Sequence, residues 1–253
     1  MSLETDVANL VTKTTTLIDY FNGKKAGIDA AVAAAVAAVP ETSRTWYVDQ
    51  VSGLDTNLGS KSSPFKSIEK AIKSTPAAGS CTVNLMGDYT LDYLIVSTCA
   101  YLFLYGGLLA TAPKLRAGYY QTTDAATGVK TTQLGGFLLM GQASSIELRQ
   151  VDPVLPAATG VTPTPTSIRL CSLIRTNAGS NLPPLVGVTL STLTVSMDST
   201  FAGALVGIST SSVVLNCTAT TFPSDFGGKY IGGVASGTEP KTLNNVLTNL
   251  SAL

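Results

Sequence analysis

Histidine is absent from the 253 residues of this chain. Catalysis by Ser-His-Asp or Cys-His groups is therefore excluded, and the commonest ligand of transition metals is missing. Charged residues make up only 13% of the sequence, about half of the share in an ordinary soluble domain. Sixteen basic residues balance sixteen acidic ones, so no net charge attracts nucleic acid or anionic lipid. We expect no nucleic-acid partner.

Paired cysteines and long apolar runs are missing as well. The four cysteines, Cys81, Cys99, Cys171 and Cys217, form no CxxC pair, so the sequence predicts buried free thiols and no metal site or other cofactor. Mean hydropathy is positive at +0.30. The apolar residues nevertheless come in short runs, whereas a bilayer crossing needs about 20 in succession. We expect no membrane insertion.

Residues 1–40 are predicted to form a helical coiled-coil stem. Apolar or small residues recur there in steps that mostly alternate between four and three, as in a heptad seam. The seam consists of Val7, Val11, Thr14, Ile18, Phe21, Ile28, Val32, Val36 and Val39. A lone helix with this surface needs partner helices, and the alternative is a helix packed onto its own domain. Asn22-Gly23-Lys24 indicates a break, and Pro40 ends the segment.

Residues 41–80 are interpreted as the opening segment of a β-helix with its capping helix. The run Thr45-Trp46-Tyr47-Val48-Asp49 alternates as a strand does, and a turn-rich stretch follows it. Phe65, Ile68 and Ile72 then share one face of a short helix predicted over residues 62–72. An amphipathic helix can cover the open apolar end of a solenoid.

Residues 81–238 carry short strands that recur at a similar spacing, which predicts a mainly β fold of the parallel β-helix type. One ladder is aligned on Leu85, Leu104, Leu148, Leu170, Leu190 and Leu215, with steps of 22, 20 and 25 residues from Leu148 onward. A second ladder consists of Leu185-Val186-Gly187, Leu205-Val206-Gly207 and Ile231-Gly232-Gly233. The alternative is a β-sandwich with evenly spaced strands.

Two stretches are expected to be insertions on the outside of the coils. They cover residues 106–133 and residues 152–166, and the second is rich in proline and is not expected to pair as a central strand. Residues 239–253 place Leu243, Val246, Leu247 and Leu250 on one helical face, so a closing helix or a tail is expected there.

Residues 46–72 resemble the opening segment of bacteriophage tail-fibre and tailspike β-helices of the pectate-lyase-like kind. The matching residues are Trp46-Tyr47-Val48-Asp49, Gly53, Asp55-Thr56-Asn57, Gly59, Pro64-Phe65-Lys66-Ser67-Ile68 and Ala71-Ile72, and residues 83–90 are similar to the first rung that follows. The resemblance implies a right-handed β-helix, a homotrimer and a place in the virion after synthesis in the bacterial cytoplasm. It also implies that the N-terminal stem contacts other tail or baseplate proteins.

The functional prediction is a virion structural protein, either a tail fibre, a tailspike or a baseplate component, that contributes to host-surface attachment as a homotrimer. Tyr119, Tyr120 and Tyr230 are candidate residues for stacking on a host surface glycan. One alternative is a glycan depolymerase, and the other is a structural connector that does not touch the host.

No catalytic residue is assigned, and the absence of enzymatic activity is favoured. Glycan cleavage needs two carboxylates about 5–10 Å apart. Glu147 is the acid within a rung, but the leucine alignment places Arg169 beside it, which predicts a salt bridge. Asp152 and Asp198 could approach each other across coils. Asp49, Asp55 and Asn57 could suggest calcium, but their spacing is not that of an EF-hand, and turn formation is the preferred interpretation.

Overall fold

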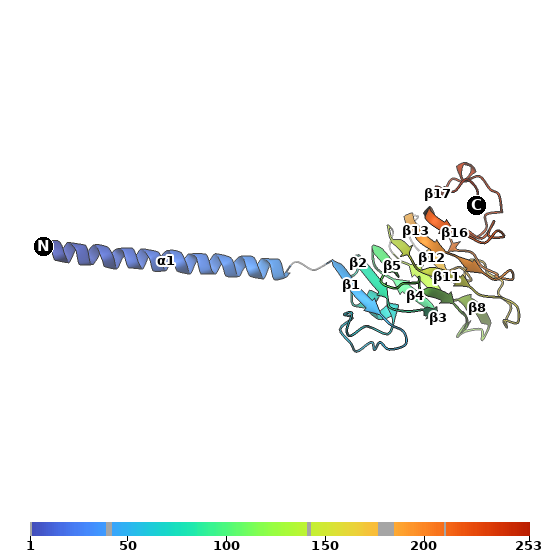
Figure 1. The fold of residues 1–253 in the computed structure, drawn as a ribbon, viewed down its shortest axis with the longest axis horizontal. Coiled ribbons are helices and arrows are strands. Elements are labelled where there is room, and N and C mark those ends of the chain that lie inside the picture. Colours follow the sequence, from blue (N-terminus) through green and yellow to red (C-terminus); the bar gives the residue numbers. More distant parts are fainter. Residues whose placement is uncertain (1, 39–41, 141–142, 177–184, 210) are drawn as a thin grey trace. The chain divides into compact units, whose positions relative to one another are not determined.

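The computed structural model describes residues 2–38, 42–140, 143–176, 185–209 and 211–253 (Figure 1). These residues form two units, which divide between residues 41 and 42. The first unit contains one helix, and the second contains the β-sheets. Val39 of the predicted seam lies outside the described residues.

The first unit is the helix α1 (Leu3–Ala38). It runs without interruption through residues 22–24, so the predicted break there is wrong. Gly23 weakens a helix but does not remove a backbone donor as a proline would. Thr12, Thr15 and Thr16 each donate a side-chain hydrogen bond to the carbonyl four residues earlier, at 2.9–3.0 Å. Every side chain from Ser2 to Ala33 is exposed. Within the described residues, none of the helices combines the length and hydropathy that a bilayer crossing requires.

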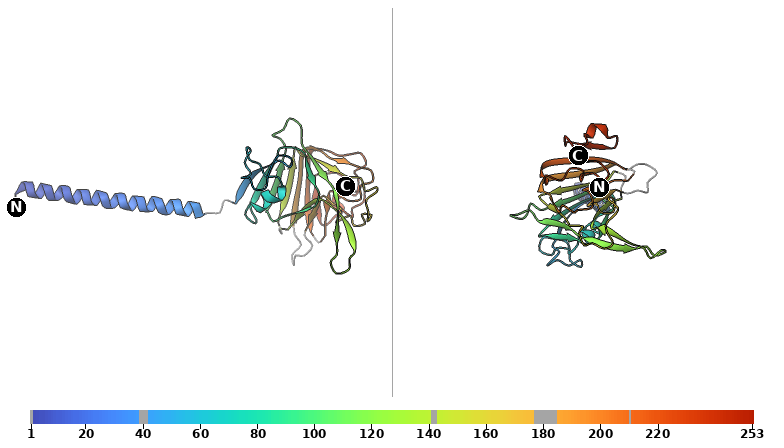
Figure 2. Two further views of the ribbon diagram at one scale, coloured as in Figure 1. Left: turned by 90° about the horizontal axis from the view of Figure 1, so that it is seen from below. Right: turned by 90° about the vertical axis from the view of Figure 1, so that its right-hand side faces the viewer.

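The second unit, residues 42–253, is built from three parallel sheets, which confirms the mainly β, parallel β-helix type of fold (Figures 1 and 2). The first sheet has the order β1 (Ser43–Val48), β2 (Ser80–Leu85), β5 (Tyr101–Tyr105), β10 (Ser145–Arg149), β13 (Leu185–Thr194), β16 (Ser212–Thr221) and β17 (Val246–Thr248). The second has β14 (Ser196–Met197), β11 (Asp152–Leu155), β6 (Lys114–Ala117) and β3 (Tyr89–Leu91). The third has β15 (Val206–Gly207), β12 (Ile174–Thr176), β9 (Gly136–Leu139) and β4 (Leu94–Ser97).

The core is a set of columns that run from coil to coil along the first sheet. Leu104, Leu148 and Leu190 are direct register partners, and each is 0% exposed. Inward and outward side chains alternate along each strand, so the leucines fill the interior while their neighbours face outward.

The predicted period is only partly right. Tyr101 lies 21 residues after its register partner Ser80, as expected. Ser145 lies 44 residues after Tyr101, and Gly187 lies 42 residues after Ser145. These two coils are long because each contains extra chain between its strands. The steps of 22 and 20 residues around Leu170 therefore belong to a single coil, and Leu170 itself lies in a turn at residues 168–171.

The second predicted ladder is also half right. Val206 pairs in parallel with Ile174 and forms a bridge to Ile231, so the third sheet does contain this part of the ladder. Leu185 belongs to β13 of the first sheet, where it pairs with Ser212. The two segments are thus similar in sequence but differ in sheet and in burial, since Leu185 is 52% exposed and Leu205 is 0% exposed.

The two predicted insertions each contain a strand of the second sheet. Residues 106–133 include β6 and an antiparallel hairpin of β7 (Tyr119–Thr123) and β8 (Lys130–Leu134), which extends from the body of the β-helix (Figure 2). Residues 152–166 include β11, which pairs with strands on both sides, so the expectation that this stretch could not pair centrally is wrong. Pro153 is tolerated because the pairing with β14 begins only at Val154, after the residue that lacks an N–H.

The short helix α2 (Ile68–Lys73) packs against β1, β2 and β4. The Ser67 hydroxyl caps it by accepting a hydrogen bond from Lys70 N at 3.1 Å. Ile68 and Ile72 are buried, as the periodicity predicted, and Phe65 is buried just before the helix begins. The helix is shorter than predicted because residues 62–66 continue the preceding loop.

Residues 239–253 do not form the closing helix that was one of the two expectations. They form the 3-10 turn η1 (Pro240–Thr242) and the strand β17. Leu253 is 1% exposed, and its backbone is held by Gly237 and Thr238. Val246 faces the core, whereas Leu247 is 68% exposed, which is the alternation of a strand and not the single face of a helix.

Candidate functional site

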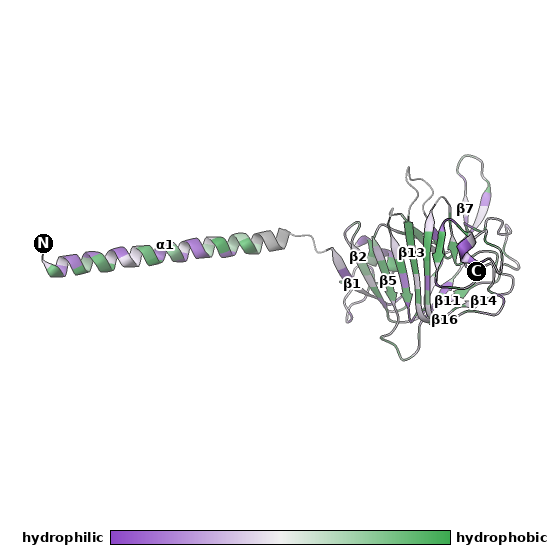
Figure 3. Ribbon diagram, turned by 90° about the horizontal axis from the view of Figure 1, so that it is seen from above, coloured by the Kyte–Doolittle hydropathy of each residue, from purple (hydrophilic) through white to green (hydrophobic). Residues whose placement is uncertain are grey.

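The exposed apolar stripe of α1 is the first candidate for a binding surface. The large apolar residues of the described seam are each 51–63% exposed, namely Val7, Val11, Ile18, Phe21, Ile28 and Val32. Leu3, Leu10 and Leu17 add exposed leucines at intervals of seven. Figure 3 shows apolar and polar residues interleaved along the helix. This many large apolar side chains exposed on one helix make it a candidate interaction surface. The side chain of Val36 is outside the description.

The hairpin tyrosines lie side by side on β7 but take part in different contacts. The Tyr119 hydroxyl accepts a hydrogen bond from Ala202 N at 3.4 Å, and burial raises the pKa of Tyr119. The Tyr120 hydroxyl donates to Gln133 Oε1 at 3.1 Å. The same oxygen accepts a bond from Arg175 at 2.8 Å, and Arg175 is 2% exposed. The Tyr119 hydroxyl therefore ties the hairpin to residue 202, whereas the Tyr120 hydroxyl joins the two strands of the hairpin at Gln133, which Arg175 links to the β-helix.

Tyr230 lies in a different aromatic cluster near the C-terminal end. Its ring centroid is 4.9 Å from those of Phe222 and Phe226, at edge-on angles. Phe226 is 1% exposed, so this cluster is part of the packing around the last coils. Of the three candidate tyrosines, Tyr119 and Tyr120 thus lie together on β7, whereas Tyr230 packs against Phe222 and Phe226.

Glu147 does form a salt bridge, but with a different arginine from the one predicted. Its carboxylate lies 2.6 Å from Arg149 on the same strand and also accepts a hydrogen bond from the Tyr101 hydroxyl. Its register partners are Phe103 and Thr189. Arg169 donates instead to the carbonyl of Thr176, because residues 168–171 turn and do not form a rung. Neither neighbouring strand thus gives Glu147 the second carboxylate of a glycosidase in register.

Asp152 and Asp198 are each occupied by other partners. Asp152 accepts from Lys114 Nζ at 2.8 Å and from Thr194 N at 2.8 Å. Asp198 accepts hydrogen bonds from the hydroxyl and the backbone N–H of Thr200. The hydroxyl bond, and then the backbone bond, lower the pKa of Asp198. The lowered pKa keeps Asp198 ionised, so it is not prepared to act as a general acid. Asp152 is engaged by Lys114 and Thr194 and not by Asp198.

Asp49 and Asp55 hold the loop before α2 through hydrogen bonds to its backbone. Partial burial raises the pKa of Asp49, but hydrogen bonds from Ser52 and Val51 outweigh it and hold that pKa below its usual value. Asp55 accepts from the backbone N–H groups of Lys66 and Ser67 at 3.0 and 2.9 Å. The contacts of Asp49 are the local turn bonding that the sequence favoured over calcium, whereas those of Asp55 join this loop to the start of α2. In the part of the chain that the structure describes, no group of three or more acidic or thiol side chains is arranged to hold a metal.

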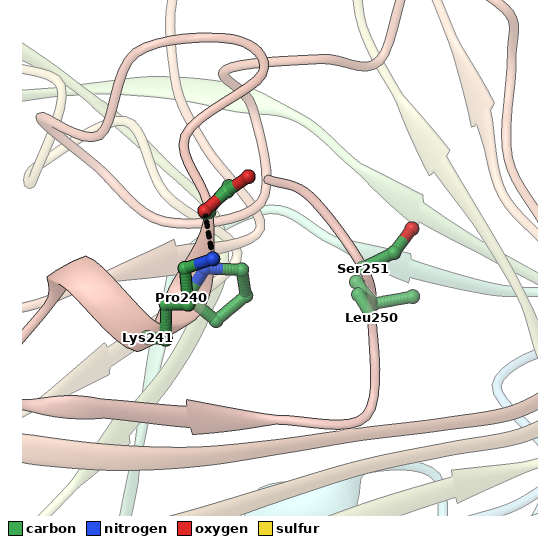
Figure 4. Close-up of a pocket in the computed structure, with 5 residues that line it drawn as sticks. Pro240, Lys241, Leu250 and Ser251 are labelled. Atoms are coloured by element: carbon green, nitrogen blue, oxygen red, sulfur yellow. Dashed lines mark ion pairs between the residues drawn. The ribbon is translucent and has the colours of Figure 1, made fainter.

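An open cleft of about 310 Å³ lies at the C-terminal end of the chain (Figure 4). It is lined by Glu239, Pro240, Lys241, Leu250 and Ser251. Lys241 and Glu239 form an ion pair at 2.7 Å with each other, and both side chains are more than half exposed. The charges of the cleft are therefore already neutralised, and its walls offer little that would select a ligand.

A row of aromatic rings on the outer face of β5 is the feature that the sequence reasoning missed. Tyr101, Phe103 and Tyr105, named here the aromatic row, alternate with the buried Leu102 and Leu104. The ring centroids of Tyr101 and Phe103 are 6.1 Å apart, and those of Phe103 and Tyr105 are 5.7 Å apart. The strict alternation Tyr-Leu-Phe-Leu-Tyr was the available signal, since it predicts three aromatic side chains on one face of a strand.

Comparisons of the chain with family models, with curated proteins and with solved structures found no match. The functional interpretation therefore depends on the surfaces described above and on the sequence pattern of residues 46–72.

Proposed function

We propose that this chain is a structural subunit of a bacteriophage tail, that it assembles as a homotrimer through α1, and that its β-helix contributes to attachment to the host surface. The observation that carries the proposal is the exposed seam of α1 in a chain that also forms a parallel β-helix. The resemblance of residues 46–72 to tail-fibre and tailspike proteins supplies the biological setting.

The seam supports three identical helices better than two. Counting heptads from the seam puts Val11, Ile18 and Val32 at the a positions. Val7, Thr14, Phe21 and Ile28 then occupy the d positions. Parallel dimers favour leucine at d, whereas β-branched residues at both a and d shift the preference to three or more strands. Three of these four d residues are β-branched, and none is leucine.

The charges beside the seam support a parallel arrangement in register. In the same heptad frame Lys24 is at a g position and Asp29 is at the e position of the next heptad. A g residue of one parallel helix lies next to that e residue of its neighbour, where opposite charges set partner and orientation. Lys25 occupies an a position, and a single lysine there specifies register at a cost in stability.

The β-helix suits attachment better than cleavage. Glu147, Asp152 and Asp198 are each held in hydrogen bonds or ion pairs as described above. A binding role needs only a rigid surface, and three copies on one stem multiply a weak affinity through avidity. A trimer that binds glycan weakly at each site is therefore consistent with the geometry.

The test uses virions of the phage that encodes this chain. Antibodies against residues 42–253 should label the tail in electron micrographs, and an excess of the full-length protein should slow adsorption of the phage to its host. An Ile18→Asp variant should compete less well, since it lacks avidity. Labelling of the tail without competition would favour a structural connector. Release of new reducing ends from host capsule or O-antigen would favour a depolymerase.

A further inference from the structure

We propose that the aromatic row binds a neutral oligosaccharide. The biological meaning of this binding rests on the proposed attachment function, but the argument for the surface itself comes from its own contacts. It also concerns different residues from Tyr119, Tyr120 and Tyr230, which are engaged in packing and in holding the hairpin.

The rings of the aromatic row are half-buried, so one part of each is fixed by the protein while another part remains accessible. The rings of Tyr101 and Phe103 are nearly parallel, with an interplanar angle of 19°. A β-strand rises about 3.3 Å per residue, so the row extends along the surface for about 13 Å. A hexopyranose presents a C–H face that can lie on an aromatic ring, and a linear oligosaccharide presents several in succession.

A charged pair fixes the central ring. The guanidinium of Arg149 lies 5.3 Å from the centroid of Phe103, within the range of a cation–π contact. The same guanidinium is bound to Glu147, whose side chain is only 11% exposed. The Tyr101 hydroxyl donates to the other oxygen of this carboxylate. The surface is therefore arranged before any ligand binds, which lowers the ordering cost of binding.

The composition of the surroundings selects the class of ligand. Thr82 and Ser80 on one side and Ser145 on the other are the short polar register partners of the row. Such hydroxyls can donate hydrogen bonds to sugar hydroxyls and accept hydrogen bonds from them. Arg149 and Glu147 cancel each other's charge, so the surface does not favour an anion. Together these features favour an uncharged sugar chain.

The experiment titrates the full-length chain, by calorimetry, with neutral oligosaccharides of six hexose units, such as maltohexaose and cellohexaose, and with a uronic acid oligosaccharide of equal length. Binding of at least one neutral sugar is expected. Phe103→Ala should weaken it about tenfold, the upper end of what one aromatic contact contributes. Thr82→Arg should block the row without removing any ring.

The matched control is Tyr93→Ala. The Tyr93 hydroxyl donates to Glu69 at 3.1 Å, and Glu69 is paired with Lys73 at 2.6 Å, so this tyrosine also serves a carboxylate–cation pair but lies elsewhere. Its loss should leave sugar binding unchanged. Equal weakening in Tyr93→Ala and Phe103→Ala would overturn the proposal.

Four other outcomes also decide the matter. Binding of the uronic acid sugar alone would overturn the choice of a neutral ligand. A change in the native mass of Phe103→Ala would show that the row is an interface between copies, which overturns the proposal. Adhesion of the full-length chain to host cells without any oligosaccharide binding would overturn the aromatic row while leaving attachment intact. Oligosaccharide binding without adhesion to host cells would overturn the proposed attachment function while leaving the aromatic row as a sugar-binding surface.

Discussion

Replacing Ile18 with aspartate should dissociate the assembly while leaving the β-helix folded. Ile18 is 53% exposed in the single chain, so roughly half of its side chain remains to be buried. Full burial of such a side chain contributes about 1.5–3 kcal/mol. The remaining half is thus worth ~1 kcal/mol in each chain and ~3 kcal/mol in a trimer.

A loss of ~3 kcal/mol lowers the association constant about a hundredfold. Three carboxylates at one layer of a coiled coil would also repel one another, so this magnitude is a lower bound. The assay is analytical ultracentrifugation over a hundredfold range of concentration, with circular dichroism to verify that the sheets are retained. Dissociation should appear at concentrations at which the unmodified protein is fully assembled.

The matched control is Thr16→Asp. Thr16 lies two residues away on the same helix, is exposed, and takes the f position on the opposite side from the seam. The Thr16→Asp substitution introduces the same charge outside the interface, so the assembly should persist. If Ile18→Asp sediments as the unmodified protein does, or if Thr16→Asp dissociates equally, the seam is not the surface that joins the chains.

Three further outcomes follow from the described contacts. Leu148→Ala should lower the free energy of unfolding by about 2–5 kcal/mol because the Leu148 side chain is 0% exposed. Leu247→Ala should change the free energy of unfolding little because Leu247 is 68% exposed. Urea titration of the two variants measures both values. Burial and the Glu147 carboxylate raise the pKa of Tyr101 to about 12, above the ordinary value of about 10. The neutral phenol therefore contributes stability below pH 10 that is lost as the pH rises through 12, and Tyr101→Phe should flatten this loss in thermal melts; an unchanged slope would contradict it. Lys24→Asp and Asp29→Lys should each weaken assembly, and the double exchange should restore it; failure of restoration would argue against the parallel register.

The features that depend on local pattern could be predicted from the sequence. The spacing of four residues between Ile68 and Ile72 gives the buried face of α2, and the steps of the seam give the exposed stripe of α1. Alternation within single strands likewise predicts which leucines face inward. These patterns need only the geometry of one helix or one strand.

The register between coils could not be predicted, because it depends on how much chain each coil inserts. Leu170 fits the spacing of a rung as well as Leu148 does, yet it lies in a turn. The same error placed Arg169 beside Glu147, whose actual neighbours come from strands 44 residues earlier and 42 residues later. The aromatic row was missed for a related reason: its flanking charges come from β10 and become visible only when the register is known.

The most direct test of the account is the native mass of the full-length chain in solution, measured by light scattering or native mass spectrometry at micromolar concentration. A homotrimer joined through α1 should have three times the 26.1 kDa of one chain, and Ile18→Asp should reduce this mass toward that of one chain. A single-chain mass for the unmodified protein at every concentration would contradict the central claim.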